Sequence, residues 1–318
     1  MTPTLVRQRP RTETRPQGRA YATRARGPLE PTAPGGTEAS RRARDWAEIQ
    51  ERMLVPLFEA VHERLEVGPS TRLLGLECGS GLALLLAAAR GACATGVDTD
   101  RARLALARER TAALSSDGPS RPGGPAVTLC ADGTPGASGD PYDVITAFQP
   151  IGRVEGDGEA LGGTGGALGD AVGLLRRGGA VVLTAWGPPE RCAASPVLRL
   201  ADRADRADRA EQGEDRPAPP DSLERLADRA GLRPDGSGRV VCPFGYADRA
   251  SAVRGLLSTG PYGGGMGGAG TGAVGTGAWS TAPTPLEREV ATALEPHTRP
   301  DGTVWLRNVF RYLIARTR

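Results

Sequence analysis

The residues best suited to chemistry lie in one short stretch, "LLGLECGSG" at 73–81, and at the end of the apolar segment that follows it. Gly79 and Gly81 form a GxG turn between an apolar run and a stretch rich in alanine and leucine. Such a turn lets backbone N–H groups approach a ligand closely, and the N-terminus of a following helix favours negative charge. Because 45 of the 318 residues are glycine, a bare GxG also arises by chance. The elements around the turn must therefore decide what it binds.

Two features of the surroundings narrow the choice of ligand. The dinucleotide fingerprint GxGxxG requires a third glycine where this chain has Leu84, which disfavours NAD and FAD. Asp98 ends the segment "CATGVD", 17 residues after Gly81. A carboxylate at the end of a second strand can accept hydrogen bonds from both hydroxyls of a ribose. The alternative is a solvated aspartate at a strand end.

The segments around the turn alternate between strand and helix patterns. Strands are predicted at 71–77, 93–98, 126–132, 142–148, 179–186, 238–246 and 304–317, and helices at 83–90, 101–114, 167–177 and 223–231. This alternation predicts an α/β fold with a doubly wound, mostly parallel sheet and helices on both faces. Ligands of such sheets bind at the carboxyl ends of the strands, where the strand order reverses.

A helical stripe precedes the first predicted strand. In "DWAEIQERMLVPLFEAVHERLEV" the apolar residues recur at steps of three and four: Trp46, Ile49, Met53, Leu57, Val61 and Leu65. Pro56 interrupts this pattern and predicts a kink or two short helices. Trp46 is compatible with a lid over a ligand and equally with a core position.

Composition divides the chain into a tail, a domain and two inserts. Residues 1–44 are rich in Arg and Pro and lack an apolar period, which predicts a disordered basic tail that is either solvated or an RNA-touching arm. Order is expected from Asp45, so that 45–318 forms one domain. Its low-complexity inserts lie at about 201–221, where an Ala-Asp-Arg repeat predicts a solvated helical extension, and at about 260–282, a glycine linker.

Charge, cysteine and histidine usage exclude several classes of protein. A net charge of +3 is too small to argue for nucleic acid by itself. The five cysteines include no CxxC pair, which indicates a reducing, cytoplasmic compartment. His62 and His297 are far apart, so no metal site is expected, and each is interpreted as a surface residue rather than a catalyst. No run of about 18 apolar residues occurs, so no membrane span is expected.

Several stretches together resemble class I S-adenosylmethionine-dependent methyltransferases, in particular bacterial small-molecule methyltransferase-like proteins. These stretches are "RLLGLECGSGLALLLAAARGACATGVDTD", "YDVITAF", "LLRRGGAVVLTAWGPPE", "CPFGYADRASAVRGLLSTGP" and "RPDGTVWLRNVFRYLIA". The resemblance covers roughly residues 45–318 without the two inserts. It implies a Rossmann-like sheet of seven strands with the last strand antiparallel, and S-adenosyl-L-methionine as cofactor. It also implies methyl transfer to O, N or C of a small organic acceptor.

The resemblance assigns roles to residues at the strand ends. Gly79 and Gly81 would contact the amino-acid part of the cofactor, Asp98 would hold the ribose, and Thr99 would lie along the adenine. Asp132, in "CADG", looks like the acid near the adenine amino group, or else forms a turn before glycine.

Further residues would line the space between cofactor and acceptor. By the resemblance these are Phe148 and Gln149, with Trp46 as a possible lid. "FQPI" has one proline where amino-group methylators of nucleic acid carry two, which disfavours that activity. No general base is evident, so no catalytic residue is named.

Glu77 can be aligned with the family in two registers. In one, it is the family's acid in "ExGxG", with Ala83 in place of the third glycine. In the other, the family's "DxGCGSG" lies over "GLECGSG", so that Gly75 has lost the acid and Glu77 has replaced the first glycine. We prefer the second register because it keeps the cysteine and the family-like step to Asp98. Our hypothesis is that Glu77 pairs with the ammonium or sulfonium of the cofactor.

Two other functions stay open at this point. One is a catalytically weak or silent methyltransferase-like protein that serves as a binding or interaction module, which the residues at positions 75 and 77 motivate. The other is an RNA methyltransferase that uses the basic tail, although nucleic acid is not the expected partner.

Overall fold

The computed structural model describes residues 38–115, 126–131, 140–151, 167–197, 200, 221–258 and 283–317. All of them belong to one structural unit, residues 36–318. The predicted basic tail up to residue 37 lies outside the described residues. So do the two predicted inserts, apart from Asp221.

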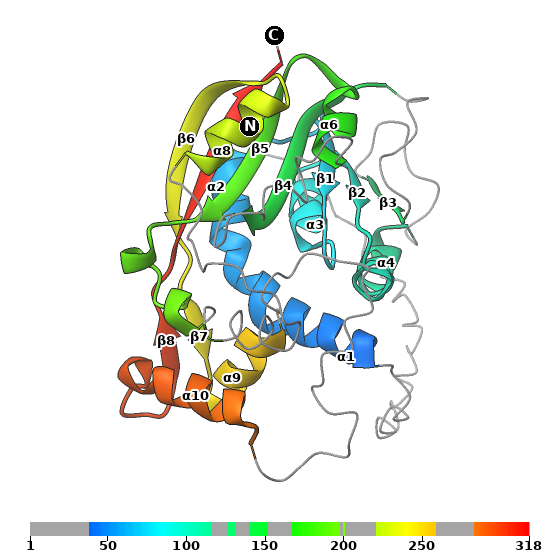
Figure 1. Cartoon of the computed structure of the whole chain (residues 1–318). Coiled ribbons are helices and arrows are strands. Elements are labelled where there is room, and N and C mark those ends of the chain that lie inside the picture. Colours follow the sequence, from blue (N-terminus) through cyan, green and yellow to red (C-terminus); the bar gives the residue numbers. More distant parts are fainter. Residues whose placement is uncertain are drawn as a thin grey trace, which may run out of the picture. The chain divides into compact units, whose positions relative to one another are not determined.

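The central sheet has seven strands in the order β3-β2-β1-β4-β5-β9-β6 (Figure 1). The strands are β1 (Arg72–Leu76), β2 (Cys93–Val97), β3 (Ala126–Cys130), β4 (Tyr142–Ile151), β5 (Leu175–Trp186), β6 (Arg233–Val241) and β9 (Val309–Arg316). β1 to β5 pair in parallel, whereas β9 pairs antiparallel with both β5 and β6. The predicted Rossmann-like sheet with a reversed last strand is therefore confirmed.

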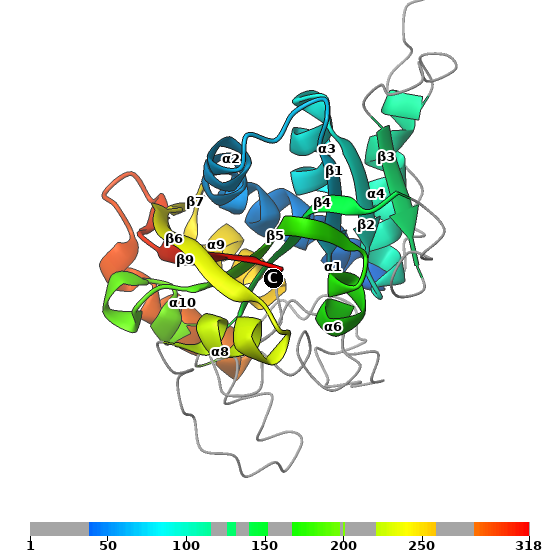
Figure 2. The same cartoon turned by 90° about the horizontal axis from the view of Figure 1, so that it is seen from above.

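Helices cover both faces of this sheet (Figure 2). α2 (Val55–Arg64) and α3 (Leu82–Ala89) lie over one face, and α6 (Ala167–Val172) and α8 (Ser222–Arg229) over the other. Alternate strand residues supply two separate cores, so that Leu73 packs with the first pair of helices and Leu74 with the second. Burial on both faces explains why the central strands read as nearly continuous apolar runs. α4 (Arg101–Ser115) packs against β3.

A smaller layer lies at the end of the sheet where β1 runs into the glycine turn (Figure 1). It contains the antiparallel pair β7 (Phe244–Tyr246) and β8 (Val304–Leu306), with α9 (Arg249–Ser258) and α10 (Pro285–Ala293). Short 3-10 turns, η3 (Pro189–Arg191) and η4 (Glu295–His297), complete the C-terminal half. The sequence interpretation did not anticipate α9 and α10 as helices.

Three predicted elements are divided or cut short in the structure. The strand predicted at 238–246 is divided into β6 and β7 at Pro243, which cannot donate to a strand ladder. The strand predicted at 304–317 is divided into β8 and β9 at Asn308, whose buried side chain bonds the backbone of Ala194 and Leu306 instead. The helix predicted at 167–177 ends at Val172, because the chain turns there into β5.

The N-terminal helical region begins earlier and is less regular than predicted. α1 (Glu38–Asp45) starts seven residues before Asp45, where the sequence placed the first ordered residue. Charged residues dominate α1, but Ala43 is buried and α1 packs against α4 and α9, which explains why it forms. A π turn, η1 (Trp46–Gln50), and a 3-10 turn, η2 (Glu51–Leu54), then lead into α2. The break predicted from Pro56 is therefore confirmed.

Two further findings concern the cysteines and the length of the helices. All five cysteines are free thiols. Among the helices that the structure describes, none has the length and apolar character that a membrane crossing would need.

Candidate functional site

The glycine turn lies at the point where the strand order reverses. β1 pairs with β2 on one side and with β4 on the other, and the turn follows directly at its carboxyl end. Three alternating residues of the turn have left-handed φ angles: 47° at Glu77, 60° at Gly79 and 80° at Gly81. Two of these positions carry glycine, as such angles favour, and the third carries Glu77. The φ angle at position 77 is thus one that glycine adopts more readily than glutamate, and the register in which Glu77 replaces a glycine stays a prediction.

Gly75 has no room for the acid that this register would place there. A Cβ atom added to Gly75 would lie 2.8 Å from Leu84 Cδ2 of α3. The same leucine would meet a Cβ atom added to Gly96 of β2, at 2.4 Å from Cδ1. Leu84 is fully buried, so it fills the space beside β1 that a longer side chain at position 75 would need.

Asp98 connects the end of β2 to the glycine turn. Its Oδ2 accepts the N–H of Gly79 at 2.7 Å, and its Oδ1 accepts the N–H of Asp100 at 2.7 Å. Only 6% of Asp98 is exposed, and burial raises the pKa of its carboxyl, while these hydrogen bonds and Arg103 oppose the shift. Each carboxylate oxygen can accept a further hydrogen bond. Thr99, the next residue, is exposed.

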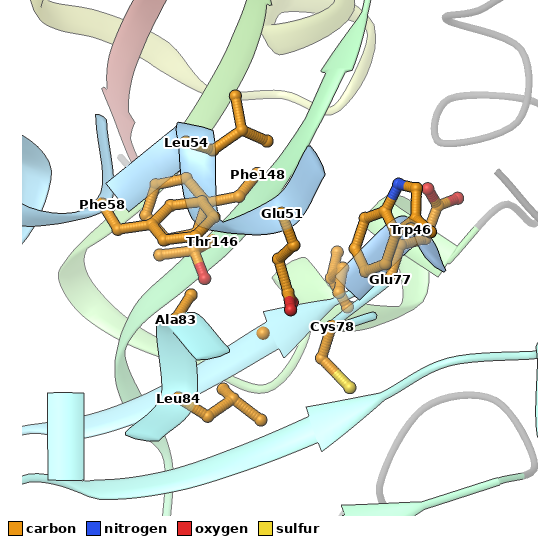
Figure 3. A pocket seen from close by; sticks show the side chains of 12 residues that line it. Trp46, Glu51, Leu54, Phe58, Glu77, Cys78, Ala83, Leu84, Thr146 and Phe148 are labelled. Atoms are coloured by element: carbon orange, nitrogen blue, oxygen red, sulfur yellow. The ribbon is translucent and has the colours of Figure 1, made fainter. Parts of the chain in front are cut away.

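A small cavity lies above the turn (Figure 3). Its volume is about 20 Å³, which is room for about one water molecule. Its lining comes from the N-terminal helical region, β1, the turn, α3 and β4: Trp46, Glu51, Leu54, Phe58, Gly75, Leu76, Glu77, Cys78, Ala83, Leu84, Thr146 and Phe148. The site is therefore almost closed.

Trp46 covers the turn from the N-terminal side. A Cβ atom added to Gly79 would lie 2.5 Å from Cη2 of the indole, so only glycine fits beneath the ring. The guanidinium of Arg103 stacks on the Trp46 indole, 4.3 Å from the centre of the ring. Trp46 is 4% exposed and thus fixed between α4 and the turn. Trp46 is therefore a core residue that also covers the turn, and its role as a lid over a ligand stays a prediction.

The side chain of Glu51, from η2, also reaches into the space above the glycine turn. Its carboxylate accepts hydrogen bonds from the Ser80 hydroxyl and from the N–H of Leu82, the latter at 3.4 Å, at the start of α3. Arg110 Nη1 of α4 lies 3.1 Å from Glu51 Oε2 and also bonds the Ser80 hydroxyl. Burial raises the pKa of Glu51, and Ser80 and Arg110 counteract the shift.

Glu77 lies beside Trp46 at the edge of the cavity (Figure 3). Burial and the negative charge of Asp98 raise its pKa to about 7, while Arg103 lowers it. Among the described residues none hydrogen-bonds the Glu77 carboxylate. A cationic group entering the cavity would therefore find a carboxyl that no described residue hydrogen-bonds.

Phe148 closes the cavity at the end of β4. Its ring packs against Phe58 at 4.8 Å and against His62 at 5.8 Å between centroids. His62 is fully buried, so its interpretation as a surface residue is wrong. The reason is the position of α2, whose His62 face lies against the core rather than the solvent. Burial lowers the pKa of His62 to about 4, and neither ring nitrogen has a partner within the described part of the chain.

The structure brings most of the predicted site residues together. Trp46, Glu77 and Phe148 line one cavity, and Gly79 and Asp98 share a hydrogen bond below it. Gly81 begins α3 as its N-cap. Thr99 does not line the cavity, and Asp132 and the side chain of Gln149 lie outside the described residues.

The sequence interpretation missed Glu51, Phe58, Leu84 and Thr146 as lining residues. Glu51 follows Trp46 by five residues, and the N–H of Glu51 donates to the carbonyl of Trp46. A search at steps of three and four cannot find such a pair, because only a π turn places these residues on one side.

No family model and no curated protein matches the chain. Several solved structures resemble it at low identity. The YcgJ protein of Bacillus subtilis is 14% identical, over 82% of this chain and 97% of that one, with a TM-score of 0.49. A putative methyltransferase of Bacillus halodurans is 10% identical, over 81% and 97%, at 0.47. A methyltransferase of Geobacter sulfurreducens in complex with S-adenosyl-L-homocysteine is 19% identical, over 87% and 98%, at 0.46. The fold assignment above rests on the observed strand order.

Proposed function

We propose that this protein is an S-adenosylmethionine-dependent methyltransferase that acts on a small organic acceptor at O, N or C. The observation that carries the proposal is the position of Asp98. It is a buried carboxylate at the end of β2, bonded to a left-handed glycine turn at the switch point of the sheet. A carboxylate there suits a ribose diol, and a switch point is where open α/β sheets bind ligands.

The proposed roles follow from the positions of the residues. Gly79 and Gly81 would contact the amino-acid part of the cofactor, and Asp98 the ribose. Glu77 would take the ammonium, since its carboxylate lines the cavity and has no hydrogen-bond partner among the described residues. Phe148 would line the pocket between cofactor and acceptor. Thr99, Asp132 and Gln149 keep the roles that the resemblance implies, as proposals, and Trp46 would cover the cofactor.

The chemistry requires little from the protein beyond alignment. The cofactor, when bound, supplies a methyl group already activated on a sulfonium, so holding acceptor and methyl close and in line provides most of the rate. The residue types of the turn fit this cofactor. The cavity of about 20 Å³ does not yet admit it, so Trp46 and Glu51 must move before the ligand enters.

The closed cavity also supports a second candidate, a silent methyltransferase-like interaction module. In that case Trp46, Glu51 and Glu77 would form a permanent plug rather than a gate. An RNA methyltransferase stays a third candidate. It was suggested by the basic tail, which lies outside the described residues up to residue 37. Tail deletion with a salt-dependent RNA-binding assay would test it.

Thermal unfolding with S-adenosylmethionine, S-adenosylhomocysteine and NAD tests the proposed function directly. A ligand at about 100 times its Kd stabilises by about 2.7 kcal/mol, which corresponds to a shift of about 5 °C or more in a domain of this size. We expect both adenosyl ligands to raise the unfolding temperature and NAD to leave it unchanged. Asp98→Asn should remove most of the shift. An unchanged wild-type temperature with both adenosyl ligands would overturn the proposal in favour of the interaction module.

A further inference from the structure

We propose that Glu51 is a latch that holds residues 46–54 closed over the glycine turn. We further propose that a ligand carboxylate replaces Glu51 at its partners when the segment opens. The second part rests on the proposed function, in which the ligand is an adenosyl amino acid. The first part concerns only this chain's own contacts.

The latch is a buried and fully bonded carboxylate. Only 2% of Glu51 and none of Ser80 is exposed. The hydroxyl of Ser80 and the guanidinium of Arg110 both contact Glu51, and they also contact each other. A buried carboxylate with such partners is stable where it lies, and removing it leaves unsatisfied donors. Glu51 is thereby the polar anchor of η2 on the turn.

The segment that the latch holds occupies the space above the turn. The Glu51 Oε1 atom would lie 3.2 Å from a Cβ atom added to Gly79, and the Trp46 ring lies closer still. In Figure 3 the Glu51 carboxylate points down toward the strand and the turn, between Phe148 and Trp46. With both side chains in place, only the cavity of about 20 Å³ remains. A ligand larger than a water molecule therefore requires the segment to move.

The partners of Glu51 suit a carboxylate that comes from outside. They are a hydroxyl, a guanidinium and the N–H of Leu82, which is one of the donors at the start of α3 that have no acceptor within the helix. An α-carboxylate has the same charge and shape as the Glu51 side-chain carboxylate. The amino-acid end of the proposed cofactor carries this group, and its ammonium would then lie toward the glycine turn. Ligand and latch would compete for one set of donors.

The backbone of the segment is built to move as a piece. It consists of the π turn η1 and the 3-10 turn η2, whose hydrogen bonds are weaker in geometry than those of an α-helix. It ends at α2, where Pro56 occupies the first turn. Opening the segment breaks the latch, the Trp46 contacts and the packing of η1 on α9, without unwinding α2.

Hydrogen exchange of the free protein tests the latch without any ligand. We expect Glu51→Gln to raise the exchange rate of amides in residues 46–54 by about tenfold or more. Ser80→Ala removes one donor and keeps the carboxylate, so it should also raise the exchange rate. It replaces Glu51→Gln in the test if that variant does not fold. Glu48→Gln is the matched control, since Glu48 pairs with the same Arg110 at 3.0 Å but is exposed. Equal exchange in all four proteins would overturn the latch.

Calorimetry with S-adenosylhomocysteine tests the competition. We expect Glu51→Gln to bind at least tenfold more tightly than the wild type, and Glu48→Gln to bind equally. If the wild type and Glu51→Gln bind the ligand with equal affinity, the proposed competition is wrong and the proposed function still stands. Faster exchange in Glu51→Gln without binding of any adenosyl ligand would support the latch and reject the proposed function.

Discussion

Replacing Glu77 with glycine is expected to stabilise the protein by about 3 kcal/mol at pH 8 and by about 1 kcal/mol at pH 5. Two causes act together. Glu77 holds a left-handed φ of 47°, which disfavours any residue with a Cβ atom. Its side chain is half-buried, and burial together with the negative charge of Asp98 raises its pKa from 4.5 to about 7, so ionisation near neutral pH opposes folding.

The sign of the pH dependence follows from that shift. Between pH 4.5 and about 7 the folded protein binds a proton at Glu77 that the unfolded chain has already released. Stability contributed by the protonated form is therefore complete below pH 4.5 and is lost as the pH rises through 7. Glu77→Gly removes this loss, so the difference in unfolding free energy between variant and wild type must grow with pH. Glycine also makes the unfolded chain more flexible, which offsets the relief of backbone strain in part.

Glu66 provides the matched control. It is the other non-glycine residue in the described chain with a left-handed φ, at 52°, but its side chain is exposed. Glu66→Gly should therefore change stability by the same small amount at pH 5 and pH 8. Urea unfolding of the three proteins from pH 4 to pH 8 measures both effects. A Glu77→Gly difference that does not vary with pH would show that Glu77 is not a buried, protonated acid.

The same substitution separates two roles of Glu77 in binding. If Glu77 pairs with the cofactor's ammonium, Glu77→Gly binds S-adenosylhomocysteine more weakly while being more stable. Such an exchange of stability for function is common at sites. Much tighter binding by the variant would mean instead that Glu77 obstructs the site, and the proposed contact would be wrong.

The sequence predicted the elements whose pattern is local. The glycine turn and Asp98 at the end of the second strand were predicted because strand ends in a parallel sheet meet at one edge, whereas Phe148, near the end of the fourth strand, followed from the resemblance alone. The break at Pro56 was likewise a local signal. These residues lie together in the structure as expected.

The closing of the site could not be predicted in the same way. It depends on a π turn that brings both Glu51 and Trp46 over Gly79, whereas a helical period of 3.6 places these residues on different sides. It also depends on Leu84, whose side chain takes the space beside Gly75 only after α3 has packed on β1. Tertiary packing likewise decides that His62 is buried, since α2 carries other polar residues that are exposed.

His62→Leu is expected to remove a destabilising contribution of about 3 kcal/mol that His62 makes to the wild type at pH 4 relative to pH 7. His62 is fully buried, and burial lowers its pKa from 6.5 to about 4, with Arg90 acting in the same direction. The folded state thus keeps the ring neutral while the unfolded chain protonates. Stability from His62 is present above pH 6.5 and is lost as the pH falls toward 4. Leucine fits a buried helical position and has no nitrogen to leave unpaired.

Urea unfolding from pH 4 to pH 7 checks this expectation, with His297→Gln as control because His297 is the chain's other histidine and lies in the partly exposed turn η4. The unfolding free energy of His62→Leu minus that of the wild type should fall by about 3 kcal/mol as the pH rises from 4 to 7, and His297→Gln should show no such change. A proton-NMR titration in which His62 protonates above pH 6 in the folded state would contradict the buried, neutral ring. Glu77 acts in the opposite direction over an overlapping range, from pH 4.5 to about 7, so the two contributions largely cancel in the wild type and each single variant exposes the other. Because Phe148 and Phe58 lie between His62 and the cavity, the two effects should add.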